Sequence, residues 1–100
     1  MQRGVTHWRS RETLAEHFRR HGRRLGCATI ELYDASARET IEVGTFFEYR
    51  DPDMGVPRAG YYDPLTERFT ALSDDEAEIL SHFRCRERYV ADTLPGSTYA

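Results

Sequence analysis

The chain has 100 residues, which is enough for one small domain with a compact core. Hydrophobic residues make up 39% of it and aromatic residues 12%, so the composition excludes an intrinsically disordered chain. The net charge of -3 argues against a general nucleic-acid binder, and no apolar run approaches the ~20 residues that a membrane span needs.

Charge is distributed unevenly along the chain. All fourteen basic residues are arginines; residues 1–27 carry seven of them against two glutamates, whereas residues 28–80 carry four against thirteen acidic residues. An arginine guanidinium is planar and can grip two oxygens of one phosphate. The basic N-terminal segment therefore fits a local phosphate site, and it fits a solvated arginine face equally well.

The first predicted helix follows a polar segment, residues 1–9, that we expect to be frayed. Ser10 is an N-cap residue type with Glu12 in the following turn, and the helix is predicted to run to His21. Gly22 is expected to end it as the C-terminal glycine. Apolar residues at helical spacing form a stripe on this segment that is predicted to pack against Ile79, Phe83 and Phe69: Leu14, Phe18 and Leu25.

A second helix is predicted over residues 30–39, with Thr29 as its N-cap and Ile30, Tyr33 and Ala37 buried. From Ile41 onward, short β-type runs alternate with turn residues, which predicts four strands: 44–50, 58–62, 68–72 and 79–84. Connections of about five residues suit antiparallel hairpins.

These elements define an α+β fold in which two N-terminal helices pack on a four-stranded antiparallel meander sheet. The chain is interpreted as a single domain, residues 1–100. Residues 10–39 form its helical part, residues 41–84 its sheet, and residues 89–100 a polar tail.

Two histidines of the first helix carry the main functional signal. His17 and His21 are one turn apart, so both imidazoles can reach a common point. Four arginines surround them, and imidazoles beside guanidinium groups are what metal-free phosphodiester cleavage uses. The arginines, which are candidates for phosphate or RNA binding, are Arg19, Arg20, Arg23 and Arg24.

The order of these residues resembles a known toxin family. His-Phe-x-basic-His-Gly at 17–22, a Leu-Gly at 25–26 and a tyrosine-bearing second helix resemble the C-terminal ribonuclease domains of bacterial polymorphic and contact-dependent toxins, which have the barnase/EndoU/colicin/RelE-like fold. Residues 60–69 (Gly-Tyr-Tyr-Asp-Pro-Leu-Thr-Glu-Arg-Phe) are similar to the family's Tyr-Asp-Pro-x-Thr-Asn-x-Phe hairpin, and residues 79–83 stand where a strand usually ends in Thr-x-Phe.

Three departures from the family pattern are visible. Arg20 stands where lysine is common, Glu67-Arg68 replaces an asparagine-containing turn, and Ser81 stands in place of threonine. Serine keeps the hydroxyl, whereas arginine keeps the charge of lysine but changes its geometry.

The resemblance implies a metal-independent endoribonuclease toxin domain that needs no cofactor and cleaves tRNA or other structured RNA. It also implies a cognate immunity protein and action in the bacterial cytoplasm, with delivery as part of a secreted toxin. We expect no signal peptide in the chain itself, because its N-terminus lacks a hydrophobic region. The alternative is a non-catalytic binding module of the same fold, either a degenerate toxin or a phage or plasmid accessory protein.

Ribonuclease chemistry without a metal needs a base, an acid and positive charge on the phosphate. We assign the catalytic candidates as His17, His21 and Ser81, with Tyr62 as a candidate for contact with an RNA base. Strand alternation places Ile79, Ser81 and Phe83 beneath the helices and turns His82 away from them. One of the two helical imidazoles is therefore predicted to lie within hydrogen-bond reach, directly or through one water, of the Ser81 hydroxyl or of a phosphate held between them.

Structural alternatives exist for each candidate. His21 on an apolar stripe is also compatible with a core histidine, and the His17/His21 pair with a zinc site, although no third ligand is near in sequence. Tyr61 and Tyr62 suit sheet packing. The two cysteines, Cys27 and Cys85, match no metal or redox spacing and are interpreted as small, partly buried thiols, with a disulfide as the alternative.

Overall fold

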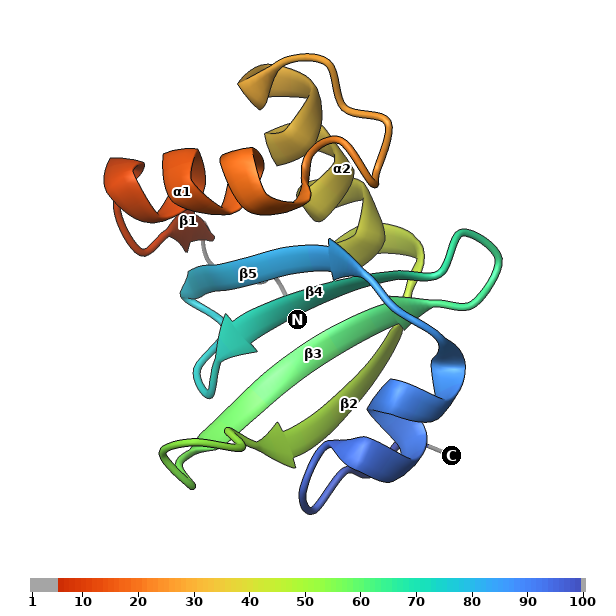
Figure 1. Ribbon diagram of the computed structural model, residues 1–100. Coiled ribbons are helices and arrows are strands. Elements are labelled where there is room, and N and C mark those ends of the chain that lie inside the picture. The colour runs from red at the N-terminus through yellow and green to blue at the C-terminus, as the bar shows by residue number, and fades with distance from the viewer. Residues whose placement is uncertain (1–5, 100) are drawn as a thin grey trace.

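The computed structural model describes residues 6–99, and within them the chain has three helices and a five-stranded mixed sheet (Figure 1). The α+β class is confirmed, but the sheet has one strand more than predicted, and one helix lies at the C-terminal end. The elements in chain order are β1 (His7–Trp8), α1 (Arg11–His21), α2 (Ile30–Val43), β2 (Thr45–Arg50), β3 (Pro57–Asp63), β4 (Arg68–Ser73), β5 (Glu78–Arg84) and the π-helix η1 (Tyr89–Thr93).

The sheet has the strand order β1-β5-β4-β3-β2. Its last four strands form the predicted antiparallel meander. The unpredicted strand β1 pairs in parallel with β5, so the expectation of a frayed segment is wrong for residues 7–8; residues 1–5 lie outside the described part of the chain. Trp8 explains the difference, because its side chain is buried and its indole Nε1 donates a hydrogen bond to Asp34 Oδ1 at 2.8 Å.

Both long helices begin at the predicted cap residues. Ser10 accepts a hydrogen bond from the Thr13 amide, and Thr29 accepts one from the Leu32 amide. Gly22 directly follows α1, as predicted, and has right-handed helical geometry. It is required for space, because a Cβ there would lie 2.7 Å from the Phe18 ring.

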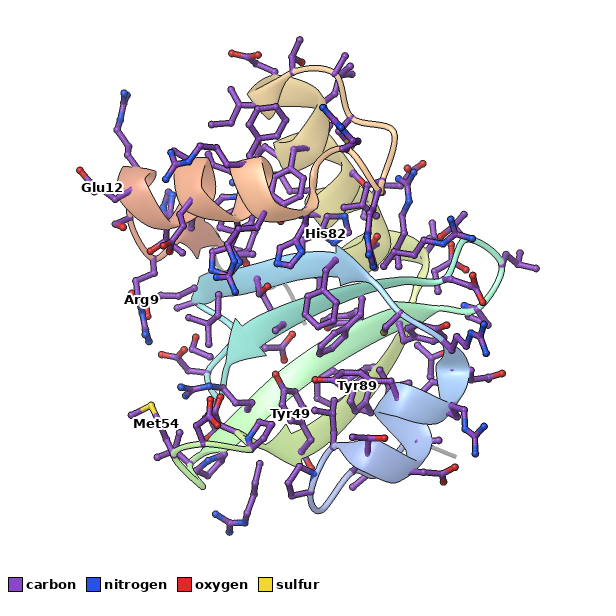
Figure 2. All side chains as sticks on the ribbon, in the orientation of Figure 1. Arg9, Glu12, Tyr49, Met54, His82 and Tyr89 are labelled. Carbon is purple, nitrogen blue, oxygen red and sulfur yellow. The ribbon has the colours of Figure 1, made fainter. Side chains whose placement is uncertain are left out.

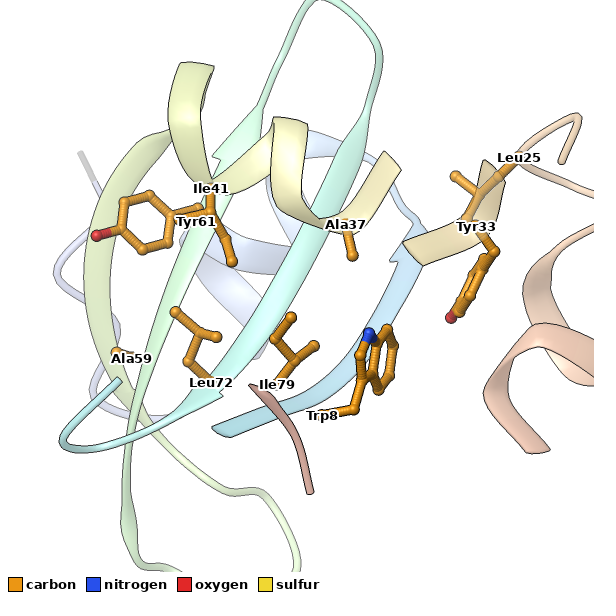
Figure 3. Close-up of a cluster of buried hydrophobic side chains, with 9 residues drawn as sticks. All are labelled: Trp8, Leu25, Tyr33, Ala37, Ile41, Ala59, Tyr61, Leu72 and Ile79. Atoms are coloured by element: carbon orange, nitrogen blue, oxygen red, sulfur yellow. The ribbon is translucent and has the colours of Figure 1, made fainter. Parts of the chain in front are cut away.

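Helix α2 packs on one face of the sheet and covers the first of two hydrophobic clusters (Figure 3). The predicted residues Tyr33 and Ala37 are buried there, whereas Ile30 is half-buried. The helix runs four residues further than predicted, because Thr40 and Ile41 are buried against the sheet as well.

Helix α1 lies along the β5 side of the sheet (Figure 1) and also contacts α2. Its residues Leu14 and Phe18 are half-buried and pack with Leu25 against the first cluster, which contains Ile79. The predicted packing on Phe69 and Phe83 is wrong, since both rings belong to the second cluster on the opposite face.

A β-bulge in β5 explains why these two rings lie on the opposite face. Ala71 pairs with Ser81 but the next residue of β4, Leu72, pairs with Ile79, so Leu80 is an extra residue in β5. A bulge interrupts the alternation of side chains between the two faces. Leu80 and Ser81 consequently both face away from α2.

The C-terminal segment, predicted as a polar tail, packs against the sheet and closes the second cluster. Val90 and Leu94 are buried in that cluster with Phe47, Tyr49 and other residues of the sheet. The chain then runs beside the outer edge of β2, where the Arg50 amide donates to the Pro95 carbonyl and the Thr98 amide donates to the Glu48 carbonyl. Within residues 6–99, no helix is both long and apolar enough to cross a membrane.

Candidate active site

The face of the sheet opposite α2 carries a cleft of about 450 Å³. One wall is formed by α1 and the residue that precedes its N-cap: Arg9, His17, Arg20 and His21. The floor is formed by β4 and β5, which contribute Phe69, Ala71, Leu80, Ser81 and Phe83. The bulge therefore brings two consecutive side chains of β5 into the floor of the cleft.

The opposite wall comes from β2, β3, the turn between them and η1. Tyr49 and Tyr89 lie on this side of the open face, across from α1 (Figure 2). Arg58 of β3, which pairs with Tyr49, completes a row of aromatic and cationic groups. Asp51 and Asp53 of the turn add acidic groups to the same wall.

The predicted contact between the helix and the strand is present. Ser81 Oγ and His17 Nδ1 are 3.0 Å apart, within hydrogen-bond distance. The rings of His17 and His21 have their centroids 5.6 Å apart, and the His21 ring packs at a tilt on Phe83 with the centroids 5.4 Å apart. The cleft thus holds one hydroxyl and two imidazoles, arranged along one helix face and one strand.

Burial and neighbouring cations keep both imidazoles neutral. Partial burial, together with the charge of Arg20, lowers the pKa of His17 below its usual 6.5. Partial burial also lowers the pKa of His21, and the charges of His17, Arg20 and Arg24 add to this effect. A neutral imidazole can accept a proton at neutral pH, and a bound phosphate would favour its charged form.

Of the four candidate arginines, the structure brings Arg20 into the cleft with the histidines. Arg19 and Arg23 line a different hollow beside Phe18 and Cys27, as expected for positions two residues away from the histidines on a helix. Arg24 lines another groove, described below.

The structure does not place Tyr62 in the cleft. Its ring is fully buried in the second cluster, and its hydroxyl donates to the Cys85 carbonyl at 2.8 Å. Tyr62 is therefore a packing residue, and the proposed contact with an RNA base is wrong. Tyr89, which is half-buried, presents an aromatic ring to the cleft instead.

Sequence reasoning missed four residues of the cleft: Arg9, Tyr49, Arg58 and Tyr89. Alternation along β2 places Phe47 and Tyr49 on one face, and antiparallel register places Arg58 beside Tyr49. This signal was available in the sequence once the hairpin was assigned. Arg9 and Tyr89 had no comparable signal, because β1 and η1 were not predicted.

The fourth strand also carries a histidine that the cleft does not use. His82 is fully buried under α2, so the predicted orientation away from the helices is wrong. Its Nε2 lies 2.8 Å from Ser36 Oγ and its Nδ1 lies 2.9 Å from Thr70 Oγ1. Desolvation lowers the pKa of His82 to about 3, which keeps the ring neutral.

Within residues 6–99, no group of three or more His, Cys, Asp or Glu side chains is arranged to hold a metal ion. Both cysteines are free thiols, as predicted: Cys27 and Cys85. Burial raises the pKa of the Cys85 thiol to about 12, so this thiol is not activated. A comparison of the chain with protein-family models, curated proteins and solved structures finds no match.

Proposed function

We propose that the protein is a metal-independent endoribonuclease that cleaves tRNA or other structured RNA. The observation that carries the proposal is the pair His17 Nδ1 and Ser81 Oγ at 3.0 Å in an open cleft. A second imidazole, His21, and the guanidinium of Arg20, which forms no ion pair with residues 6–99, stand beside this pair. Together they supply the functional groups that cleavage of RNA through its own 2′-hydroxyl requires.

The reaction begins with removal of the 2′-hydroxyl proton by a neutral imidazole, and the 2′-oxygen then attacks the adjacent phosphorus. The bond from phosphorus to the 5′-oxygen breaks, and an imidazolium gives that oxygen a proton. The products are a 2′,3′-cyclic phosphate and a 5′-hydroxyl. The charges of His17 and His21 repel each other, so the pair favours one neutral and one charged ring once the phosphate is bound.

Ser81 and Arg20 serve the same phosphate. The Ser81 hydroxyl fixes the orientation of the His17 ring through Nδ1, leaving Nε2 for proton transfer. The Arg20 guanidinium, together with Arg58 from the opposite wall, stabilises negative charge on the phosphorane oxygens. Tyr89, which is half-buried at the cleft wall, offers a ring on which a base next to the scissile bond can stack.

The test is a cleavage assay in EDTA with a 12-nucleotide RNA labelled at its 5′ end. We expect cleavage of the RNA, a 2′,3′-cyclic phosphate on the 5′ product, and no cleavage of the DNA of the same sequence. A deoxy-oligonucleotide cut equally well would contradict attack by the 2′-hydroxyl. Activity lost in EDTA and restored by zinc would support a metal site at the two histidines instead.

A non-catalytic binding module of the same fold is the second candidate. The acidic turn supports it, because Asp51 and Asp53 stand on the cleft wall that faces the histidines and repel a polyanion. Expression in bacteria separates the two candidates. An active toxin needs a cognate immunity protein or an inactivating substitution to be produced, whereas a binding module expresses freely.

A further inference from the structure

The second groove of interest is basic and lies where the cleft ends. Its volume is about 540 Å³, and it is lined by Arg24, Glu67, Arg84, Cys85 and Arg86. Three cations and one carboxylate line it, which leaves a net charge of +2. This part of the surface contrasts with the net charge of -3 for the whole chain.

Two of the three cations are free to bind a ligand. Arg84 donates to Glu67 Oε1 through Nη2 at 3.0 Å and through Nε at 3.3 Å, so this pair is internally neutralised. Arg24 and Arg86 have no carboxylate partner among the described residues. Both side chains are exposed, and a guanidinium can donate two parallel hydrogen bonds to a phosphate.

The groove continues the cleft along two chain segments. His21 lines the cleft, and Arg24 lines the groove three residues later. On β5, Phe83 lines the cleft and the next residue, Arg84, lines the groove. The ring contact between His21 and Phe83, with centroids 5.4 Å apart, therefore marks the boundary between the two cavities. The charge of Arg24 also reaches the cleft, where it reinforces the effect of burial on the pKa of His21.

A phosphate at the histidines is separated from the groove by a few residues of strand. Arg84 is three residues beyond Ser81, which corresponds to about 10 Å along a β-strand. The groove would accordingly hold a different phosphate of the same strand. We propose that Arg24 and Arg86 form a subsite for a backbone phosphate of the RNA strand outside the scissile bond, an inference that rests on the proposed ribonuclease function.

The test compares substrates of different length. We would measure kcat/KM in EDTA for a dinucleotide and for a 12-nucleotide RNA, with wild type and with Arg24→Gln/Arg86→Gln. We expect the double variant to lose ~10- to 100-fold on the 12-mer, because each hydrogen bond to a charged group contributes roughly tenfold. On the dinucleotide, which does not reach the groove, we expect less than about a twofold change on the same scale.

A matched control uses two other arginines. Arg19→Gln/Arg23→Gln removes the same number of charges, but these side chains line the hollow beside Cys27. We expect this variant to cleave both substrates at wild-type rates. An equal loss in both double variants would overturn the subsite, since it would show a general effect of net charge. The subsite is also overturned if Arg24→Gln/Arg86→Gln lowers kcat/KM no more on the 12-mer than on the dinucleotide. The same result is expected if the groove binds an acidic protein surface instead of RNA.

A binding arm keeps the test independent of catalysis. A 2′-O-methyl 12-mer cannot be cleaved, and its affinity can be followed by fluorescence anisotropy against salt concentration. We expect the slope of log K against log salt to become shallower by about 1.4 in Arg24→Gln/Arg86→Gln, at ~0.7 per contact. If the slope differs in this way between wild type and the double variant but wild type cleaves no RNA, the proposed function fails and the subsite stands. An unchanged slope overturns the subsite, whether or not RNA is cleaved.

Discussion

The two faces of β5 hold histidines in opposite chemical situations. On the open face, His17 meets Ser81 through one ring nitrogen, and its other ring nitrogen is available to a ligand in the cleft. On the α2 face, His82 has both ring nitrogens in contact with hydroxyls and no exposed surface. Ser81 and His82 are adjacent residues, so a single peptide unit separates a site suited to proton transfer from a structural one.

This contrast shows which properties decide the role of a histidine. Burial lowers the pKa on both faces, below the usual 6.5 for His17 and to about 3 for His82. The ring under α2 is too deeply desolvated to take up a proton near neutral pH, and both its hydrogen-bonding positions are occupied. Partial exposure and an available nitrogen, rather than residue type, are what suit His17 to catalysis.

The largest expected effect is on the open face. His17→Ala or His21→Ala should reduce RNA cleavage by ~10²–10⁴-fold, because a positioned proton-transfer group contributes that much to the rate. The rate is measured as kcat/KM on a 12-nucleotide RNA, and circular dichroism confirms that the fold is retained. The control is His7→Ala, since that side chain is exposed on β1, outside the cleft. Wild-type cleavage by the His17→Ala/His21→Ala double variant would refute the assignment.

The next effect is on the opposite face and concerns stability. His82→Ala should lower the free energy of unfolding by about 2–4 kcal/mol, because it leaves a cavity and removes a hydrogen-bond partner from Ser36 and Thr70. Denaturant unfolding measures this change. The exposed His7→Ala should change it by less than ~0.5 kcal/mol. A His82→Ala protein as stable as wild type would mean that the buried network does not hold α2 on the sheet.

The same contrast predicts how the histidines titrate. The pKa of His82 is lowered to about 3 in the folded protein, so between pH 6.5 and pH 3 the unfolded chain binds the proton and the folded chain does not. The free energy of unfolding is therefore unaffected by the titration of His82 above pH 6.5. It decreases as the pH falls toward 3, by up to ~1.4 kcal/mol per pH unit. An NMR titration of the imidazole signals checks this: as the pH is lowered from 7, the His17 and His21 signals should move before the His82 signals do. Movement of all three with one midpoint would contradict the difference between the faces.

The smallest effects are expected from the two serines that contact these rings. Ser81→Ala should slow cleavage by less than about tenfold, since it removes one hydrogen bond that orients the base, and Ser81→Thr should be tolerated because the hydroxyl remains. Ser36→Ala should leave the rate unchanged and lower the midpoint of thermal unfolding, because Arg68 and His82 both contact that hydroxyl. A Ser36→Ala variant that slows cleavage without loss of stability would show that the two faces are coupled.

Local sequence signals were sufficient for the elements with ordinary caps and turns. Ser10 and Thr29 begin the helices where predicted, and the meander from β2 to β5 follows from short runs separated by turn residues. A contact between Ser81 and one of the two helical imidazoles was predicted as well, from helical spacing and from the residue order of the family that the sequence resembles. Strand alternation was used for it too, but with Ser81 assigned to the wrong face.

Features that depend on distant contacts were not predictable in this way. A bulge depends on how the strand fits its neighbours, so the extra residue Leu80 leaves no signature in β5 alone. Strand β1 has two residues and exists because Trp8 is buried against a distant part of the chain. Helix η1 likewise depends on Val90 entering a cluster built by the sheet. Each of these elements owes its structure to partners that are far away in sequence.

The segment beside β2 has a consequence for how the protein behaves in crowded solution. An uncovered strand edge offers backbone donors and acceptors that a strand of another molecule can join, the first step of ordered aggregation. Here the Pro95 carbonyl and the Thr98 amide occupy two of those positions, and Thr98 Oγ1 accepts from the Glu48 amide. The last residues of the described chain therefore cover this edge and hinder pairing with a strand of another molecule. Shortening the chain at this end would expose the edge of β2 and favour self-association, even if the cleft kept its geometry.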